Sequence, residues 1–176
     1  DTRAPVSVDL EALRLTAPDA KALSALFKEL EFRQLQHSVP QAADLSGKDY
    51  RAVLDPAALA ELVDRLRAAE LAAIDTETTS TDPMRAELVG ISVAIMPDQA
   101  FYIPCGHFYL GAPQQLERDG VLRQLSPYLQ DPRHKKVGQN IKYDWIVLAR
   151  HGVELDGVVF DTMLASYLLD PSKRAH

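Results

Sequence analysis

Three apolar runs follow one another closely in the middle of the chain, and their order restricts the folds open to it. They are LAAID at residues 71–75, ELVGISVAIMP at 87–97 and QAFYIPC at 99–105. Their alternating or continuous apolar character, broken by Pro and turn residues, predicts three strands. Only the short segment MPDQ joins the last two runs. We therefore expect these two to pair as an antiparallel hairpin.

Helical patterns surround these runs and complete the predicted fold. Residues 55–69 form a helix in which Asp55 is the expected N-cap and Pro56 lies in the first turn. The apolar residues predicted to face inward are Leu59, Leu62, Val63 and Leu66. Further along we expect a helix over 112–132 that Gly120 could interrupt, a strand at 135–140, a helix over 141–152, and a strand turning into a helix over 158–169. The pattern predicts an α/β fold, a mixed sheet flanked by helices.

The N-terminal part of the chain reads differently. Residues 16–32 predict an amphipathic helix that begins at 17–19. The residues that follow lose periodicity and carry Pro, Ser and Gly, which indicates a linker. We therefore divide the chain into 1–35, a linker at 36–50, and the main domain at 51–176.

Composition narrows the classes of protein. Of 176 residues, 47% are hydrophobic and 25% charged, as in ordinary globular domains. No apolar run approaches the roughly 20 residues that span a bilayer, and the N-terminus lacks both a signal-peptide pattern and Met, so we expect a processed product or a piece of a longer chain. The single Cys105, predicted to be a packing residue, fits the reducing cytoplasm. The net charge of −6 gives no overall basic surface for nucleic acid.

Two acids end the first apolar run. Because side chains at i and i+2 of a strand share a face, Asp75 and Glu77 are presented together while Thr76 points away. Their Cα atoms would lie roughly 7 Å apart. Two such carboxylates repel unless a cation or proton lies between them, and hard oxygen ligands suit Mg²⁺ or Mn²⁺. Taken alone, the pair is more often a solvated strand end.

A second polar cluster lies at the start of the helix over 141–152. Asn140 and Asp144 are four residues apart and share a face beside an apolar stripe, which we expect to contain Ile141, Trp145 and Leu148. An Asp beside a buried stripe is costly unless it is hydrogen-bonded or near a cation. The simpler interpretation makes Asn140 an N-cap and Asp144 a first-turn acid favoured by the helix dipole.

Together these segments resemble a known family. DTETTSTDP and ELVGISVAI, followed by KVGQNIKYDWIVLARHGVEL and VFDTMLASYLLD, are similar to the 3′→5′ proofreading exonuclease domain of bacterial DNA polymerase I, one of the DEDD exonucleases on an RNase H-like fold. Asp75 and Glu77 match its first motif, and Asn140 and Asp144 match its second. The segment ALSALFKELEFRQL resembles the tail of the 5′-nuclease domain, which the resemblance assigns to residues 1–35.

The resemblance implies a two-metal site holding Mg²⁺ or Mn²⁺. Asp75 would bridge the two ions, Glu77 would hold the first ion and orient the attacking water, and Asp144 would serve the second. The implied reaction is hydrolysis of 3′-terminal DNA phosphodiesters to nucleoside 5′-monophosphates. The parent chain would be a DNA polymerase acting in replication and repair.

The same resemblance implies a set of substrate contacts. The expected residues are Thr76, through its backbone N–H, together with Gln139, Asn140, Lys142 and Tyr143. They would hold the 3′ end of single-stranded DNA by backbone contacts and stacking rather than by base readout. The other expected partner is the rest of the polymerase chain. We expect a cytoplasmic monomer with no membrane partner.

One part of the family pattern does not appear. A third motif, Tyr-x-x-x-Asp, should supply a fourth carboxylate, yet none of the six Tyr residues is followed by Asp at that offset. We therefore expect a fold incomplete at the C-terminus and weak or no hydrolysis by this chain alone. Two alternatives remain: a non-catalytic scaffold with an exonuclease-like fold, and an RNase D-like 3′→5′ exonuclease acting on RNA.

Several other polar residues have simpler interpretations. Asp161 precedes Thr162 at a helix start and is expected to be an N-cap. The basic run 133–136 is expected to be a solvated loop, although it could touch phosphates.

Overall fold

The computed structural model describes residues 14, 18–32, 35 and 47–172, and the chain divides into two units, Asp1–Ser46 and Gly47–His176. In the first unit, helix α1 spans Ala20–Glu29. Its N-cap is Asp19, whose side chain accepts hydrogen bonds from the N–H groups of Lys21 and Ala22. The predicted helix and its start are confirmed. None of its residues is buried.

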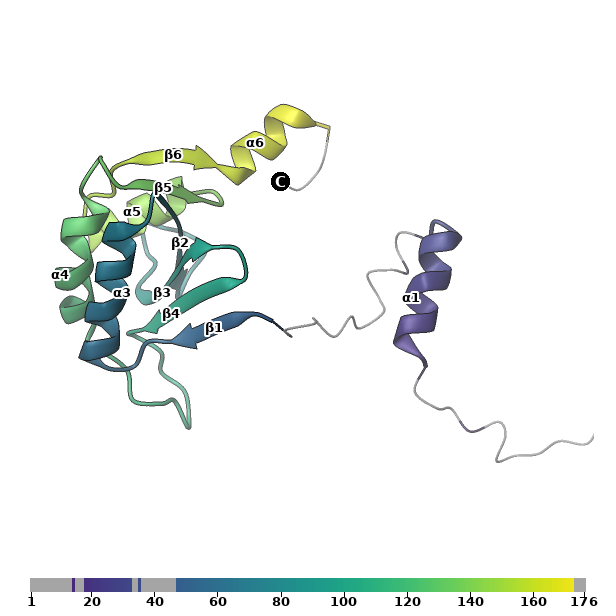
Figure 1. The fold of residues 1–176 in the computed structure, drawn as a ribbon, viewed down its shortest axis with the longest axis horizontal. Coiled ribbons are helices and arrows are strands. Elements are labelled where there is room, and N and C mark those ends of the chain that lie inside the picture. Colours follow the sequence, from purple (N-terminus) through teal and green to yellow (C-terminus); the bar gives the residue numbers. More distant parts are fainter. Residues whose placement is uncertain (1–13, 15–17, 33–34, 36–46, 173–176) are drawn as a thin grey trace, which may run out of the picture. The chain divides into compact units, whose positions relative to one another are not determined.

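The second unit is built on a six-stranded mixed sheet of order β1-β4-β3-β2-β5-β6 (Figure 1). The strands are β1 (Asp49–Ala52), β2 (Leu71–Thr78), β3 (Leu88–Met96), β4 (Gln99–Pro104), β5 (Lys135–Gly138) and β6 (Val158–Asp161). Strand β3 is antiparallel to both neighbours, and the other pairs are parallel. The hairpin of β3 and β4 is confirmed, as is the mixed α/β architecture.

Strand β1 is the element that the sequence did not predict. Its sequence, DYRA, has no apolar alternation, and three of its four residues are exposed. It is a strand because it pairs in parallel with β4 at the edge of the sheet, a contact between segments about fifty residues apart. The sheet therefore begins at Asp49, so the predicted linker, 36–50, overlaps it at its last two residues.

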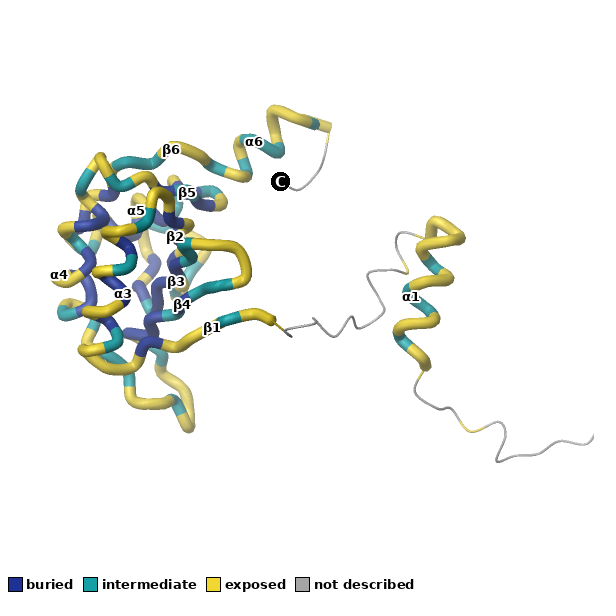
Figure 2. Tube along the Cα trace, in the orientation of Figure 1, coloured by how far each residue is buried: buried dark blue, intermediate teal, exposed yellow. Residues whose placement is uncertain are grey.

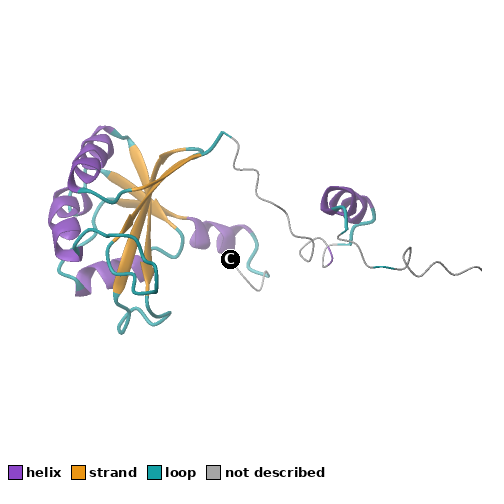
Figure 3. Ribbon diagram, turned by 90° about the horizontal axis from the view of Figure 1, so that it is seen from below, coloured by secondary structure: helices purple, strands orange, loops and turns teal. Residues whose placement is uncertain are grey.

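Four helices accompany the sheet: α3 (Pro56–Ala68), α4 (Arg118–Leu129), α5 (Lys142–Arg150) and α6 (Thr162–Leu169). Helices α3, α4 and α5 lie together on one side of the sheet (Figure 3). Helix α4 begins at Arg118 and continues through Gly120, so the break considered there does not occur. None of these helices, nor α1, is long and apolar enough to cross a bilayer within the described residues.

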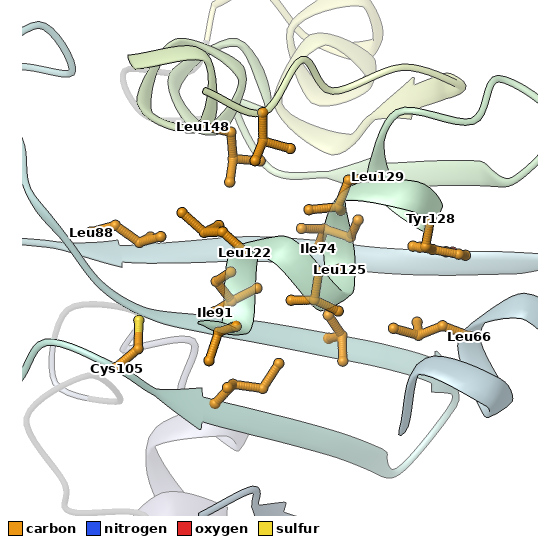
Figure 4. Close-up of a cluster of buried hydrophobic side chains, with 14 of the residues drawn as sticks. Leu66, Ile74, Leu88, Ile91, Cys105, Leu122, Leu125, Tyr128, Leu129 and Leu148 are labelled. Atoms are coloured by element: carbon orange, nitrogen blue, oxygen red, sulfur yellow. The ribbon is translucent and has the colours of Figure 1, made fainter. Parts of the chain in front are cut away.

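The core lies between the sheet and this helical layer. The inner face of α3 is as predicted, with Asp55 as its N-cap. Side chains of α4, such as Leu122 and Leu125, lie beside Ile74 and Ile91 of the sheet (Figure 4). Cys105 is buried in the same cluster, which confirms its role as a packing residue.

Helix α6 differs from the other three helices of this unit. None of its residues is buried, although most are apolar, and Leu168 and Leu169 are 81% and 86% exposed. Figure 2 shows α6 in the colours of exposed and half-buried residues, while the strands and the inner faces of α3 and α4 contain the buried ones. The apolar surface of this helix is therefore open to solvent.

The basic run 133–136 is not the solvated loop that the sequence suggested. Its last two residues begin β5, and strand alternation turns Lys136 fully inward. There its ammonium donates to the carbonyl oxygen of Asp131 at 2.8 Å and lies 5.0 Å from the ring centroid of Tyr128. Burial lowers the pKa of Lys136, against the opposing effect of nearby acids.

We expect Lys136→Ala to lower the free energy of unfolding by about 2–3 kcal/mol, because it opens a cavity and removes one of the two donors to the Asp131 carbonyl, the other being the N–H of His134. Its exposed neighbour provides the control, since Lys135→Ala should change stability by less than about 0.5 kcal/mol. Urea unfolding measures both. Equal effects of the two substitutions would contradict the burial of Lys136.

Candidate active site

Strand β2 carries the first two acids of the site. Along it exposed and buried residues alternate, so Asp75 and Glu77 lie on the face away from α3, while Thr76 is buried on the other side. This confirms that the two carboxylates share a face. Directly across the ladder, Asp75 pairs with Ser92 and Glu77 with Gly90. The space over Gly90 is occupied by the phenol ring of Tyr102, whose pKa is raised by burial and then by the charge of Glu77.

The third acid comes from α5 and is almost completely buried. Asp144 is 2% exposed, and its Oδ1 accepts hydrogen bonds from the backbone N–H of Thr76 at 2.8 Å and from its hydroxyl at 2.6 Å. These two bonds fix the first turn of α5 against β2. They also place the third acid directly beside the strand that carries the other two.

The apolar stripe predicted for α5 is confirmed at Ile141 and Leu148, which are buried, and is wrong at Trp145. The buried residues of the helix are Asp144, Val147 and Leu148, whereas Trp145 is 47% exposed. A sequence pattern favours Trp over Asp for the inward face, but the hydrogen bonds from Thr76 satisfy the carboxylate there. The helix is rotated accordingly, and the indole faces outward.

The three carboxylates influence one another. The pKa of Asp75 is raised, first by its partial burial and then by the negative charge of Glu77. The pKa of Asp144 is also raised by burial, and Asp75 adds to this, while the hydrogen bonds from Thr76 oppose it. Among the described residues, none of these three acids forms an ion pair. Within this part of the chain, therefore, no cationic side chain balances their charges, and Asp144 has only its hydrogen bonds from Thr76.

Such a set of hard oxygen donors suits a divalent cation, which would relieve the repulsion. The set is partial, however. Within residues 14, 18–32, 35 and 47–172, no group of three or more His, Cys, Asp or Glu side chains is close enough to hold a metal ion by itself. The acids thus fit a metal ion by their chemistry and charge, without forming a complete cage.

The turn before α5 has an unusual backbone. Asn140 has a positive φ of 57°, a left-handed conformation that residues other than Gly adopt infrequently. The N-cap of α5 is Ile141, and no side chain of the helix start caps it. The interpretation of Asn140 as the N-cap is therefore wrong. Instead, the backbone N–H groups of Asn140 and Ile141 donate to the carboxylate of Asp161.

Only part of the role of Asp161 was predicted from the sequence. Its predicted role as N-cap of α6 is confirmed, because it accepts hydrogen bonds from the N–H groups of Met163 and Leu164. The bonds to the turn before α5 were not foreseen. The β5–β6 pairing, which places Gly138 opposite Asp161, brings this carboxylate to the turn.

The residues expected to contact substrate lie around the acids in two groups. A polar hollow of about 460 Å³ is lined by Thr76, Asn140 and Tyr143 together with Glu77 and residues 78–81. The hydroxyl of Tyr143 bonds to the Ser80 carbonyl and to the Thr78 hydroxyl at its wall. The expected free N–H of Thr76 is not available, since it donates to Asp144.

The remaining two expected residues lie elsewhere. Gln139 lines a second, largely apolar hollow of about 510 Å³ that also includes Asp75 and Thr162. Lys142 is exposed, and its ammonium bonds to the Asn140 side chain. The structure therefore brings Thr76, Asn140 and Tyr143 together, and places Gln139 on the other side of the acids.

Sequence comparison matches residues 50–176 to a family model described as 3′-5′ exonuclease. DNA polymerase I of Pseudomonas aeruginosa is 41% identical over 189 residues, covering 99% of this chain and 21% of that protein. DNA polymerase I of Chloroflexus aurantiacus is 38% identical, covering 96% of this chain and 22% of that protein. The chain thus spans about a fifth of the length of these relatives.

Solved structures share the fold at lower identity. Trypanosoma brucei RNase D in complex with RNA U12 gives a TM-score of 0.55 at 22% identity, over 68% of this chain and 39% of that one. The polymerase domain of Pol1 from M. smegmatis, with DNA primer-template and dNTP, gives 0.56 at 23%, over 71% and 20%. Brucella melitensis NrnC with bound Mg²⁺ gives 0.50 at 24%, over 73% and 56%. The predicted RNase H-like fold is confirmed.

The buried acid yields a prediction about stability. Because the pKa of Asp144 is raised above its ordinary value of 3.8, the folded state holds this proton more tightly than the unfolded state. The free energy of unfolding should therefore fall as pH rises from about 4 through the raised pKa. In Asp144→Asn the side-chain oxygen still accepts from Thr76 and the charge is gone. We expect this variant to be more stable than wild type by about 1 kcal/mol at pH 7.

Urea unfolding between pH 4 and 8 measures this difference. The exposed Asp64→Asn serves as the control, which should follow the wild-type curve. A variant less stable than wild type at every pH would show that the charge of Asp144 stabilises the fold.

Proposed function

Because the chain belongs to the 3′-5′ exonuclease family, we propose that it carries most of the proofreading exonuclease domain of a bacterial DNA polymerase I, a domain that removes nucleotides from the 3′ end of DNA. The observation that carries the proposal is the placement of Asp75 and Glu77 on one strand face, next to the buried Asp144. The match to the Pseudomonas aeruginosa relative covers 99% of this chain and so includes residues before 50. We assign those residues to the tail of the 5′-nuclease domain and a linker.

Asp75, Glu77 and Asp144 would hold Mg²⁺ or Mn²⁺ in this proposal. Bound ions would lower the pKa of the attacking water and stabilise the leaving 3′ oxygen. The raised pKa values of Asp75 and Asp144, which come first from burial and then from a neighbouring carboxylate, support this assignment. The Mg²⁺ bound by Brucella melitensis NrnC agrees with it.

The chain's own residues would position the substrate. Thr76 holds Asp144 in place, which replaces the role in nucleotide binding expected for its N–H. Asn140, Tyr143 and the polar walls of the 460 Å³ hollow offer hydrogen bonds to a sugar–phosphate backbone. Gln139 and Lys142 would contact the strand at the rim. Contacts of this kind ignore base identity, which suits an enzyme that removes any mismatched nucleotide.

Two other functions deserve comparison. A non-catalytic scaffold would have no reason to keep three carboxylates that pair with no described cation, of which Asp144 is buried at a cost in stability. An RNase D-like activity on RNA is favoured by the fold, yet the RNase D likeness is only 22% identical. The identity of 41% with a DNA polymerase I over nearly the whole chain favours DNA. We further propose a cytoplasmic monomer whose partner is the rest of the polymerase.

Metal binding tests the site directly. Calorimetric titration of Mn²⁺ into the chain should show saturable binding, because the three acids repel one another without a cation. Asp75→Ala and Asp144→Ala should each weaken the affinity at least about tenfold. The control Asp64→Ala, on the exposed side of α3, should bind as wild type does. Identical titrations of all four proteins would contradict a metal site at these acids.

Hydrolysis tests the reaction and its substrate. With Mg²⁺ and end-labelled single strands, we expect weak or no digestion by this chain, because its described acids form only a partial metal site. The polymerase that carries the domain should release nucleoside 5′-monophosphates from DNA, and Asp75→Ala should slow this at least about tenfold. Faster digestion of RNA than of DNA would favour the RNase D-like function instead.

A further inference from the structure

One carboxylate accepts main-chain hydrogen bonds from two separate segments. Oδ1 of Asp161 accepts from the N–H groups of Asn140 at 3.1 Å, Met163 at 2.8 Å and Leu164 at 3.3 Å. Its Oδ2 accepts from the N–H of Ile141 at 2.9 Å. An ordinary N-cap serves only the helix that it begins. Asp161 serves the start of α6 and, 20 residues earlier, the start of α5.

The charge of this carboxylate supports its double role. Burial alone would raise the pKa of Asp161, but the hydrogen bonds from Asn140, Ile141, Leu164 and Met163 outweigh that effect and lower it. The group is therefore ionised at neutral pH, when its bonds to N–H groups are strongest.

The turn that it holds needs such support. Asn140 lies in the left-handed backbone region, and α5 has no capping side chain of its own. The neighbouring Gly138 is closely packed, because an added Cβ would lie 2.9 Å from the Ile141 side chain and 3.0 Å from the carbonyl oxygen of Ile74. The turn is thus tightly packed on one side and held by Asp161 on the other.

The first turn of α5 continues directly from this support. The carbonyl of Asn140 accepts from the N–H of Tyr143 at 2.8 Å, and that of Ile141 accepts from the N–H of Trp145 at 2.9 Å. Asp144 lies between these two donors, and its Oδ1 bonds to Thr76. Hydrogen bonds therefore hold the backbone on both sides of Asp144, and the Asp144 side chain bonds to β2.

We propose that Asp161 is a positioning residue of the exonuclease site, which fixes the Asn140–Ile141 turn and thereby holds Asp144 against Thr76. The proposal rests on the proposed function for its catalytic meaning, because Asp144 is one of the three acids assigned there. Asp161 itself touches neither the acids nor the hollow lined by Asn140 and Tyr143. Through the same carboxylate, the start of the exposed helix α6 is tied to the start of α5.

Amide hydrogen exchange of the whole chain, followed by NMR, tests this. The N–H of Thr76 reports on Asp144, because Oδ1 of Asp144 is its acceptor. In Asp161→Asn the side-chain oxygen can still accept hydrogen bonds from the start of α6. The amide NH₂ then faces the N–H of Ile141, and these two donors cannot bond to each other. We expect exchange at Thr76 and Ile141 to accelerate about tenfold or more. A role confined to capping α6 would accelerate exchange only at its first turn.

Asp55→Asn is the matched control. Asp55 caps α3 with the same pair of bonds, to Ala57 at 3.0 Å and Ala58 at 2.9 Å, and has no contact with the turn before α5. Exchange at Thr76 should be unchanged in this variant. Unchanged exchange at Thr76 in Asp161→Asn, or an equal increase in both variants, would overturn the proposal.

A double variant distinguishes the loss of this support from a general loss of folding. Gly adopts the left-handed conformation of position 140 without strain, so Asn140→Gly should lessen the need for Asp161. We expect it to restore part of the protection of Thr76 when combined with Asp161→Asn, and no restoration would count against the proposal. The measurement needs neither metal nor substrate. Its failure would leave the proposed function standing, and failure of Mn²⁺ binding would leave this result standing.

Discussion

The two hydrogen bonds from Thr76 to the buried carboxylate of Asp144 are the contact on which the rest of the site depends. They join the helical layer to the strand that presents Asp75 and Glu77, so the third acid is held against the strand that carries the other two. They also explain the rotation of α5, which turns a carboxylate inward and an indole outward. Without them the buried charge would lack any compensation, and this packing of α5 would be unfavourable.

Local patterns predicted much of this arrangement. The inner face of α3, the β3–β4 hairpin, the shared face of Asp75 and Glu77 and the capping role of Asp161 all follow from the spacing of nearby residues. The features that were not predicted from the sequence share a different cause. Strand β1, the inward Lys136, the exposed Trp145 and the left-handed Asn140 are determined by partners far away in the sequence. For the site, residue types and their faces could be predicted, but the partners of Thr76 and Asp161 could not.

The acids of this domain fall into two electrostatic classes. Asp161 is surrounded by N–H donors that lower its pKa, and it stabilises the structure in its ionised form. Asp75 and Asp144 have raised pKa values, because burial opposes their ionisation, as do the charge of Glu77 at Asp75 and the charge of Asp75 at Asp144. The ionised carboxylate of Asp161 stabilises the fold, whereas ionised Asp75 and Asp144 destabilise it. Such a contrast within one small region is typical of a site where stability is sacrificed for chemistry.

The sequence separation within the site bears on how the chain folds during synthesis. Thr76 and Asp144 are 68 residues apart, and the central strand β2 also needs the distant β5 as a neighbour. A ribosome adds about 5–20 residues each second, so β2 leaves it several seconds before α5 is available. During that interval β2 can pair only with β3. Asp144 can therefore reach β2 only in the last part of synthesis, once α5 has left the ribosome.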